Sequence, residues 1–206
     1  MKRVLTGILI FGFLVSLSTI SQAVTITFDG LVGSNIDLFP TSYIESGFTI
    51  TGTGGSWFEA HFFGNPEPDI FAETTSSIQV KRTAPGDFTF ASVDVASSSG
   101  ESSTASFKGY LDTVLVLDLS GSFASTFEFV TATNFLTVPL DTLDITLTPG
   151  IGVAAVNLDN IVVDPLPASI PEPATMLLFG SGLVGLFGFR RKFRREIQTE
   201  FSLIER

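Results

Sequence analysis

Leu143-Asp144-Ile145-Thr146-Leu147 alternates apolar and polar side chains with a period of two. This alternation is typical of a strand with one face on a core and the other in solvent. Similar short runs recur along the chain, separated by segments rich in Gly, Ser, Pro and Asp. The other expected strands are residues 24–28, 48–50, 77–80, 88–90, 93–95, 104–110, 114–119, 126–130 and 153–163.

This spacing predicts an all-β fold, an antiparallel β-sandwich of about eight to ten strands. Among sandwiches we favour a jelly-roll-like topology, although strand number alone does not fix it. The parity of the apolar residues slips between Phe90 and Val93, which predicts a β-bulge there. Helices are expected only at the two ends of the chain, because no stretch between them shows a helical period.

The N-terminus predicts a cleavable export signal. Lys2 and Arg3 precede an apolar stretch over residues 4–15, and Ser21-Gln22-Ala23 follows with small residues at the positions that a signal peptidase requires. We expect a signal peptide over residues 1–23, cleaved between Ala23 and Val24. The alternative, a retained membrane helix, is disfavoured because the apolar stretch is short for a membrane span.

The C-terminus predicts a membrane anchor. Pro171, Glu172 and Pro173 precede 16 uncharged residues, 174–189, which would rise roughly 24 Å as a transmembrane helix. A basic cluster follows directly, and such clusters mark the cytoplasmic side of a span. Residues 24–170 would therefore lie on the periplasmic side of the inner membrane. The cluster consists of Arg190, Arg191, Lys192, Arg194 and Arg195.

This order of tripeptide, apolar span and basic cluster resembles the PEP-CTERM sorting segment of exported proteins of Gram-negative bacteria. The resemblance implies a substrate of exosortase, a membrane transpeptidase, with Pro171, Glu172 and Pro173 as the recognition tripeptide and residues 190–195 as the stop signal. It further implies transfer to the cell surface or the medium after processing, and an association with exopolysaccharide or biofilm matrix. The chain departs from the family in its tail, residues 196–206. A second tripeptide at residues 66–68 lacks a following span and is expected to be a turn.

The expected organisation is therefore a signal peptide (1–23), a secreted domain (24–164), a linker (165–170), a sorting segment (171–195) and a cytoplasmic tail (196–206). Between the two ends the chain holds 17 acidic and three basic residues, a formal charge of 3 − 17 = −14. Such a domain repels nucleic acid, which excludes nucleic-acid binding. The chain has no cysteine, so disulfides and thiolate sites are excluded.

A second resemblance concerns the domain itself. Ile26-Thr27-Phe28-Asp29 and Leu158-Asp159-Asn160-Ile161-Val162-Val163 resemble the paired first and last strands of jelly rolls of the carbohydrate-binding-module type. Phe107-Lys108-Gly109-Tyr110 is similar to a segment of PEP-CTERM proteins of this architecture. In such jelly rolls a structural calcium often lies where the terminal strands meet, which implies Asp29 and Asp159 as its ligands here. The alternative is that both are ordinary carboxylates at strand ends.

No residues predict catalysis. His61 is the only histidine, and although Glu59 would share its strand face, no nucleophile motif surrounds a serine. Trp57 follows a glycine-rich segment and could stack on a sugar ring if exposed, with Tyr43 and Tyr110 as lesser candidates. The sequence favours a non-enzymatic surface or matrix protein; a lectin-like carbohydrate-binding module is the alternative.

Overall fold

The computed structural model describes residues 22–167 together with Leu178, Ser181 and Gly182. The chain divides into two compact units, Met1–Pro167 and Ala168–Arg206. The predicted signal helix, the sorting segment and the cytoplasmic tail lie outside the described residues, apart from those three positions. Within the described part of the chain, no helix is both long enough and apolar enough to span a membrane.

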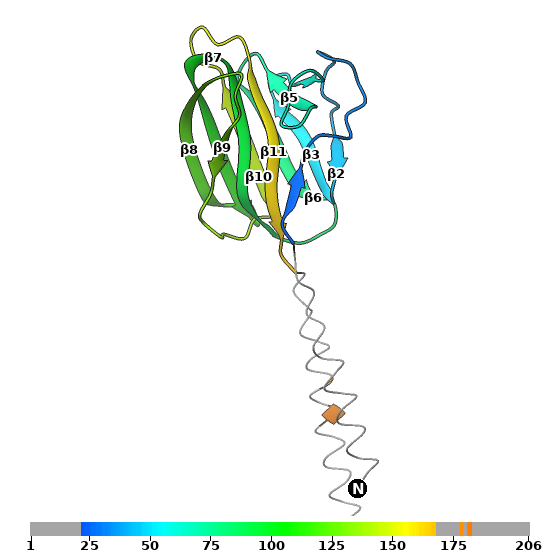
Figure 1. The fold of residues 1–206 in the computed structure, drawn as a ribbon. Coiled ribbons are helices and arrows are strands. Elements are labelled where there is room, and N and C mark those ends of the chain that lie inside the picture. The colour runs from blue at the N-terminus through cyan, green and yellow to red at the C-terminus, as the bar shows by residue number, and fades with distance from the viewer. Residues whose placement is uncertain (1–21, 168–177, 179–180, 183–206) are drawn as a thin grey trace, which may run out of the picture. The chain divides into compact units, whose positions relative to one another are not determined.

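Eleven strands make up the described domain (Figure 1). They are β1 (Val24–Ile26), β2 (Tyr43–Glu45), β3 (Phe48–Gly54), β4 (Phe58–Ala60), β5 (Asp69–Ala72), β6 (Ser76–Arg82), β7 (Phe88–Leu111), β8 (Val114–Thr126), β9 (Val130–Thr133), β10 (Thr142–Thr148) and β11 (Val156–Pro165).

The strands form two antiparallel sheets that share one strand. In the first sheet the order is β4-β5-β11-β7-β9, and β1 pairs with the part of β11 that β5 leaves free. In the second sheet the order is β2-β3-β6-β10-β7-β8. The predicted all-β antiparallel sandwich is therefore confirmed.

The shared strand, β7, turns from one sheet into the other. Its first part pairs with β11 from Phe88 to Ser97, and its last part pairs with β10 from Thr104 to Tyr110. The serine-rich stretch between them lies where the strand changes sheets. Three predicted strands, 88–90, 93–95 and 104–110, are thus parts of one element.

The core lies between the facing sides of the two sheets. On β10 the apolar residues Leu143, Ile145 and Leu147 are fully buried, whereas Asp144 and Thr146 between them are partly exposed. Phenylalanine contributes much of the remaining volume: the rings of Phe48 and Phe88, for example, meet edge to face at 5.3 Å between centroids. On β10 the apolar residues of the alternating pattern therefore face the core, and the polar residues face the solvent.

Three details differ from or refine the predicted strands. The expected bulge is confirmed, because Phe90 and Val93 are both buried and the β7–β11 register shifts opposite Ala91. The strand expected over residues 126–130 is wrong: β8 ends at Thr126 and Phe127 has a positive φ of 54°. The short strands β2, β4 and β5 were not predicted, since three or four residues show too little alternation.

The two ends of the domain lie side by side. Val24, the residue after the predicted cleavage site, is the register partner of Val163 on β11. Beyond β11, the Leu166 N–H donates to the Asp87 carbonyl at 2.9 Å, and Arg82 Nη1 donates to the Leu166 carbonyl at 3.2 Å. The domain therefore begins and ends at one end of the sandwich.

Candidate functional site

The outer face of the second sheet is polar across its width. One row of register partners runs from Thr51 on β3 through Gln79, Asp144 and Lys108 to Asp118 on β8. The next row runs from Thr49 through Lys81 and Thr142 to Tyr110. These residues alternate with the buried apolar ones, so the strand period alone places them together on this face.

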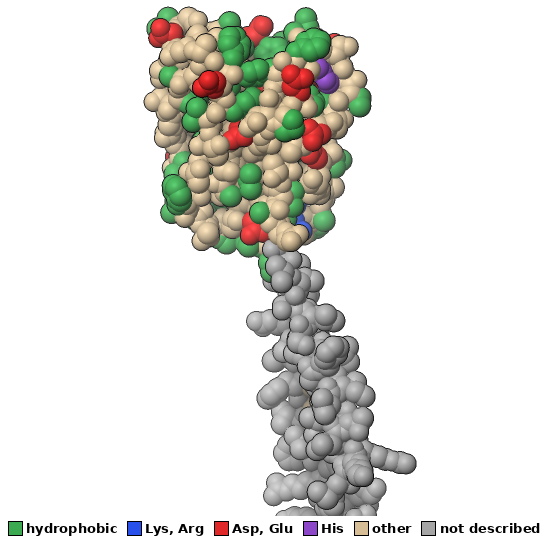
Figure 2. Space-filling model, in the orientation of Figure 1, with side chains coloured by type: hydrophobic (Ala, Val, Ile, Leu, Met, Phe, Trp, Pro, Cys, Tyr) green, Lys and Arg blue, Asp and Glu red, His purple; other side chains and the backbone are tan. Residues whose placement is uncertain are grey.

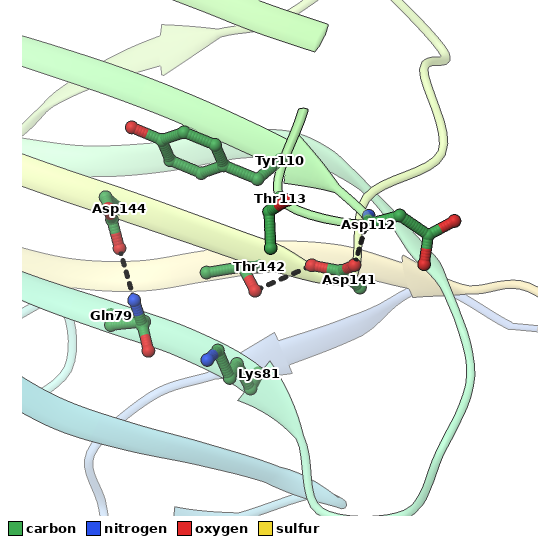
Figure 3. A pocket seen from close by; sticks show the side chains of 8 residues that line it. All are labelled: Gln79, Lys81, Tyr110, Asp112, Thr113, Asp141, Thr142 and Asp144. Atoms are coloured by element: carbon green, nitrogen blue, oxygen red, sulfur yellow. Dashed lines mark hydrogen bonds between the residues drawn. The ribbon is translucent and has the colours of Figure 1, made fainter. Parts of the chain in front are cut away.

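A groove of about 640 Å³ lies on this face (Figure 3). Its volume is within the range of small-molecule and sugar sites. The side chains come from three neighbouring strands and from the β7–β8 turn, which brings residues distant in sequence to one place. The lining residues are Gln79, Lys81, Tyr110, Asp112, Thr113, Asp141, Thr142 and Asp144.

Hydrogen bonds fix the orientation of several of these side chains (Figure 3). Gln79 Nε2 donates to Asp144 Oδ1 at 2.9 Å. Asp141 accepts from the Thr142 hydroxyl at 2.7 Å and from the Asp112 N–H at 2.6 Å. Four of the lining side chains, those of Gln79, Asp141, Thr142 and Asp144, are therefore held in place before any ligand arrives.

Lys81 joins this groove to a second, smaller one. A hollow of about 240 Å³ on the β3 side shares Gln79 and Lys81 with it and is otherwise lined by Thr49, Thr51, Arg82 and Thr83. Among the described residues, no acidic side chain forms an ion pair with the Lys81 ammonium. The continuous surface offers donors, acceptors and one aromatic ring, Tyr110, which is the combination that binds hydroxylated ligands.

The prediction that Trp57 is an exposed stacking platform is wrong. Trp57 is only 4% exposed and belongs to the core, and its indole N–H has no hydrogen-bond partner. The residue precedes β4 on the chain, where its ring points into the sandwich. Tyr43 is also buried, and its hydroxyl donates to Glu45 Oε2 at 3.0 Å. Of the three aromatic candidates only Tyr110 lines a groove.

Asp29 and Asp159, the predicted calcium ligands, lie in different environments. Asp29 is exposed in a turn, whereas Asp159 is fully buried, and its two oxygens accept the N–H groups of Asn65 and Asn160, each at 2.7 Å. The described residues contain no group of three or more acidic or histidine side chains placed to hold a metal ion. The calcium site therefore stays a prediction, without a preformed cage in this part of the chain.

Asp159 belongs to a buried acidic row that the sequence did not reveal. It is the register partner of Asp94, and Asn65 Nδ2 lies 3.4 Å from Asp94 Oδ2. Asp69 on β5 is also buried. Burial raises the pKa of Asp159 to about 7, two backbone N–H groups oppose this rise, and the charges of Asp94 and Asp29 add to it. In the sequence Asp94 is merely the polar member of an alternating strand.

His61 and Glu59 form a pair, with Nε2 and Oε2 2.8 Å apart. Glu59 Oε2 also accepts the Gly33 N–H at 3.1 Å, and the His61 N–H donates to Asn35 Oδ1 at 3.0 Å. Both residues thus connect β4 and the residue after it to the loop that precedes β2. These contacts indicate that the pair holds the loop before β2 in place.

Known proteins match two different parts of the chain: a family model matches the C-terminal segment, and solved structures match the β-domain. The family model described as the PEP-CTERM protein-sorting motif matches residues 169–192. The chain carries a PEP-CTERM motif. The match contains Pro171, Glu172 and Pro173 and the first three residues of the basic cluster, so the resemblance read from the sequence is confirmed. Arg194 and Arg195 lie beyond it.

Solved structures match the domain at low sequence identity, and no curated protein sequence matches the chain. A DUF4465 family protein from Bacteroides caccae is 8% identical, with a TM-score of 0.52, over 70% of this chain and 100% of that chain. CBM29_1, a family 29 carbohydrate-binding module from Piromyces equi, is 13% identical, with a TM-score of 0.42, over 75% of this chain and 98% of that chain. At an identity this low, the similarity to the DUF4465 family protein is evidence of the fold alone.

Proposed function

We propose that this protein is an exported, non-enzymatic polysaccharide-binding protein of the cell envelope, which exosortase sorts through the PEP-CTERM motif. The observation that carries the binding proposal is the polar groove on the second sheet, with Tyr110 among fixed hydrogen-bonding side chains. A purely structural matrix protein would not need such a groove. The export signal and the membrane anchor predicted from the two ends support delivery to the cell surface, where the domain would meet extracellular polysaccharide.

The expected ligand is a neutral polysaccharide. The domain carries a formal charge of −14, and the carboxylates of Asp112, Asp141 and Asp144 line or border the groove. A polyanion such as a polyuronate would be repelled by this field. Neutral hydroxyl groups can instead accept from Lys81 and donate to the carboxylates, while Tyr110 packs against a sugar ring.

Affinity electrophoresis tests this binding. The purified protein is run on native gels that contain a neutral β-glucan, a neutral β-mannan or polygalacturonate. We expect retardation by a neutral polymer only, and a loss of roughly tenfold in affinity for Tyr110→Ala or Asp144→Ala, equivalent to about 1.4 kcal/mol. The matched control is Thr53→Ala, an exposed position of β3 outside the groove. Unchanged mobility on both neutral polymers, or equal retardation of all variants, would reject the proposal.

Intact mass spectrometry tests the sorting. The mature protein from its native host should lack residues 1–23 and the segment that follows the Pro171-Glu172-Pro173 region, and the second loss should require exosortase. If a host without exosortase yields the same C-terminal end, the motif serves only as an anchor.

A further inference from the structure

Strand β8 is a long sheet edge without the usual protection. One of its edges pairs with β7 over most of its length, and no described strand pairs with the other. Natural proteins keep edge strands short or place charges on them to prevent pairing with other chains. β1, β2, β4 and β9, at the other sheet edges, have three, three, three and four residues, whereas β8 has 13. Figure 1 shows β8 at the flank of the domain.

The composition of β8 makes the contrast sharper. Asp118 is its only charged residue, it contains no proline, and it begins with the exposed residues Val114, Leu115 and Val116. An exposed edge of this kind is a template for another strand. The rest of the domain carries many charged residues, so the scarcity of charge is a local property of β8.

We propose that β8 pairs antiparallel with β8 of a second copy of this chain, about a two-fold axis at Ser120. The regular stretch of the strand, residues 117–123 between the two register shifts of the β7–β8 pairing, then pairs with itself. On the core-facing side, Leu117 meets Phe123 of the second copy and Leu119 meets Gly121. On the outer side, Ser120 meets its own symmetry mate.

The faces of the strand support this register. Leu117 and Phe123 are buried in the core of one copy, and Leu119 packs against it. Between Leu117 and Phe123, pairing about Ser120 therefore places apolar residues or glycine opposite one another on the core side and polar residues opposite one another on the outer side. The same surface patch serves both copies, as a two-fold interface requires.

The position of the one charged residue also favours pairing with a second copy in this register. The single carboxylate, Asp118, lies opposite Ser122 of the second copy, where its charge meets a hydroxyl. A shift of the two-fold axis to residue 118 would instead place Asp118 opposite itself, which is destabilising. Because each domain carries a charge of −14, the two copies repel each other, and added salt should favour the dimer by screening this repulsion.

Cysteine cross-linking tests the register, because the native chain has no cysteine. In Ser120→Cys the two Cα atoms would be about 4.5–5.5 Å apart across the pair, within disulfide range. In Ser122→Cys, the matched control on the same outer face, the two cysteines would be four residues, or roughly 13 Å, out of register. After oxidation of host membranes that contain the full-length chain, we expect a reducible band of twice the mass from Ser120→Cys only. No such band, or equal bands from both variants, would overturn the proposal.

Sedimentation of the purified full-length chain in detergent tests the dimer without a cross-link. Ser120→Lys places two ammonium groups opposite each other at the axis and should halve the mass. Thr53→Lys, at an exposed position of β3, should leave the dimer intact, and circular dichroism verifies that both variants fold. A wild-type monomer at every NaCl concentration, or a dimer in both variants, would contradict the pairing. Neither result bears on polysaccharide binding, since the groove residues lie outside β8.

Discussion

Asp69 is a fully buried carboxylate in the first sheet. Its Oδ2 accepts from Asn157 Nδ2 at 2.9 Å, and its Oδ1 has no hydrogen-bond partner. Burial raises the pKa of Asp69 to about 9, and the nearby charge of Asp159 acts in the same direction. The folded protein therefore retains a proton on Asp69 at pH values at which the unfolded chain has lost it.

We expect the stability of the domain to fall as the pH rises from about 4 to about 9. In this window the folded state binds more protons than the unfolded state, so the free energy of unfolding decreases with pH, by at most roughly 1.4 kcal/mol per pH unit for one group. Asp69→Asn cannot ionise and should flatten the decrease. Urea unfolding at pH 5 and pH 8 measures it, with Asp118→Asn, an exposed position, as the control. A slope that Asp69→Asn leaves unchanged would show that Asp69 is not the group responsible.

Glu45 fixes the segment that follows β1. Its two oxygens accept from the Thr27 N–H at 3.1 Å, the Thr27 hydroxyl at 2.9 Å, the Phe28 N–H at 2.9 Å and the Tyr43 hydroxyl at 3.0 Å. Glu45→Gln replaces one acceptor oxygen by a donor and should cost about 1–3 kcal/mol in the free energy of unfolding. Glu73→Gln, at an exposed position, should cost almost nothing in the same urea titration. Equal stability of the two variants would contradict this role of Glu45.

Single residues were the least predictable level of this structure. Alternation correctly separates core from surface on β10, yet it treats Asp94 as a surface residue. In the folded domain Thr131, Asn160 and Asn65 donate hydrogen bonds to that carboxylate, and no local pattern in the sequence reports these long-range contacts. The prediction for Trp57 is wrong for a similar reason, since the burial of its ring depends on strands that are distant in the chain.

At the scale of elements, β7 depends on Gly109. This residue lies between Leu143 on β10 and Leu117 on β8, and it is buried. A Cβ atom there would lie 2.9 Å from the Leu117 Cβ and would also clash with Leu140. The close approach of the Leu117 and Leu140 side chains thus requires a residue without a side chain.

Gly109→Val should therefore destabilise the domain by about 1–3 kcal/mol, the usual cost of overpacking a core. A thermal melt should show a decrease of roughly 2–4 °C per kcal/mol for a chain of this size. Gly52→Val is the control, because nothing lies within 4 Å of a Cβ at that position of β3. A decrease of equal size in both variants would assign the effect to strand propensity rather than to packing.

The long elements were predicted better than the short ones, for a physical reason. Period-two alternation identifies strands such as β10 because five or more residues sample both faces of a sheet. It also locates the bulge near Ala91, since a one-residue insertion reverses the parity of everything after it. It did not reveal that β7 enters both sheets, because the serine-rich stretch where the strand changes sheets shows no alternation. The groove was missed for a different reason: it combines three strands whose adjacency is set only by the topology.

At the scale of the whole molecule, the dominant feature is excess negative charge. On the face that Figure 2 shows, acidic side chains are spread over the surface and basic atoms occur only near its lower edge. Self-repulsion of this kind destabilises a compact state, and salt screens it. We therefore expect NaCl to raise the melting temperature by a few degrees between about 0.01 and 0.5 M, and a melting temperature that falls with salt would contradict this account.

A comparison of calcium with sodium distinguishes screening of the overall negative charge from binding of a cation at a specific site. Sodium and calcium chloride at equal ionic strength screen the domain similarly, so screening alone predicts equal melting temperatures. The predicted site at Asp29 and Asp159 requires a further rise with calcium, because a cation that binds only the folded state adds its binding free energy to the stability. Asp159→Asn should remove this further rise and leave the response to sodium. Equal melting temperatures in the two salts would instead mean that the acidic surface has no calcium site and acts only through its overall field.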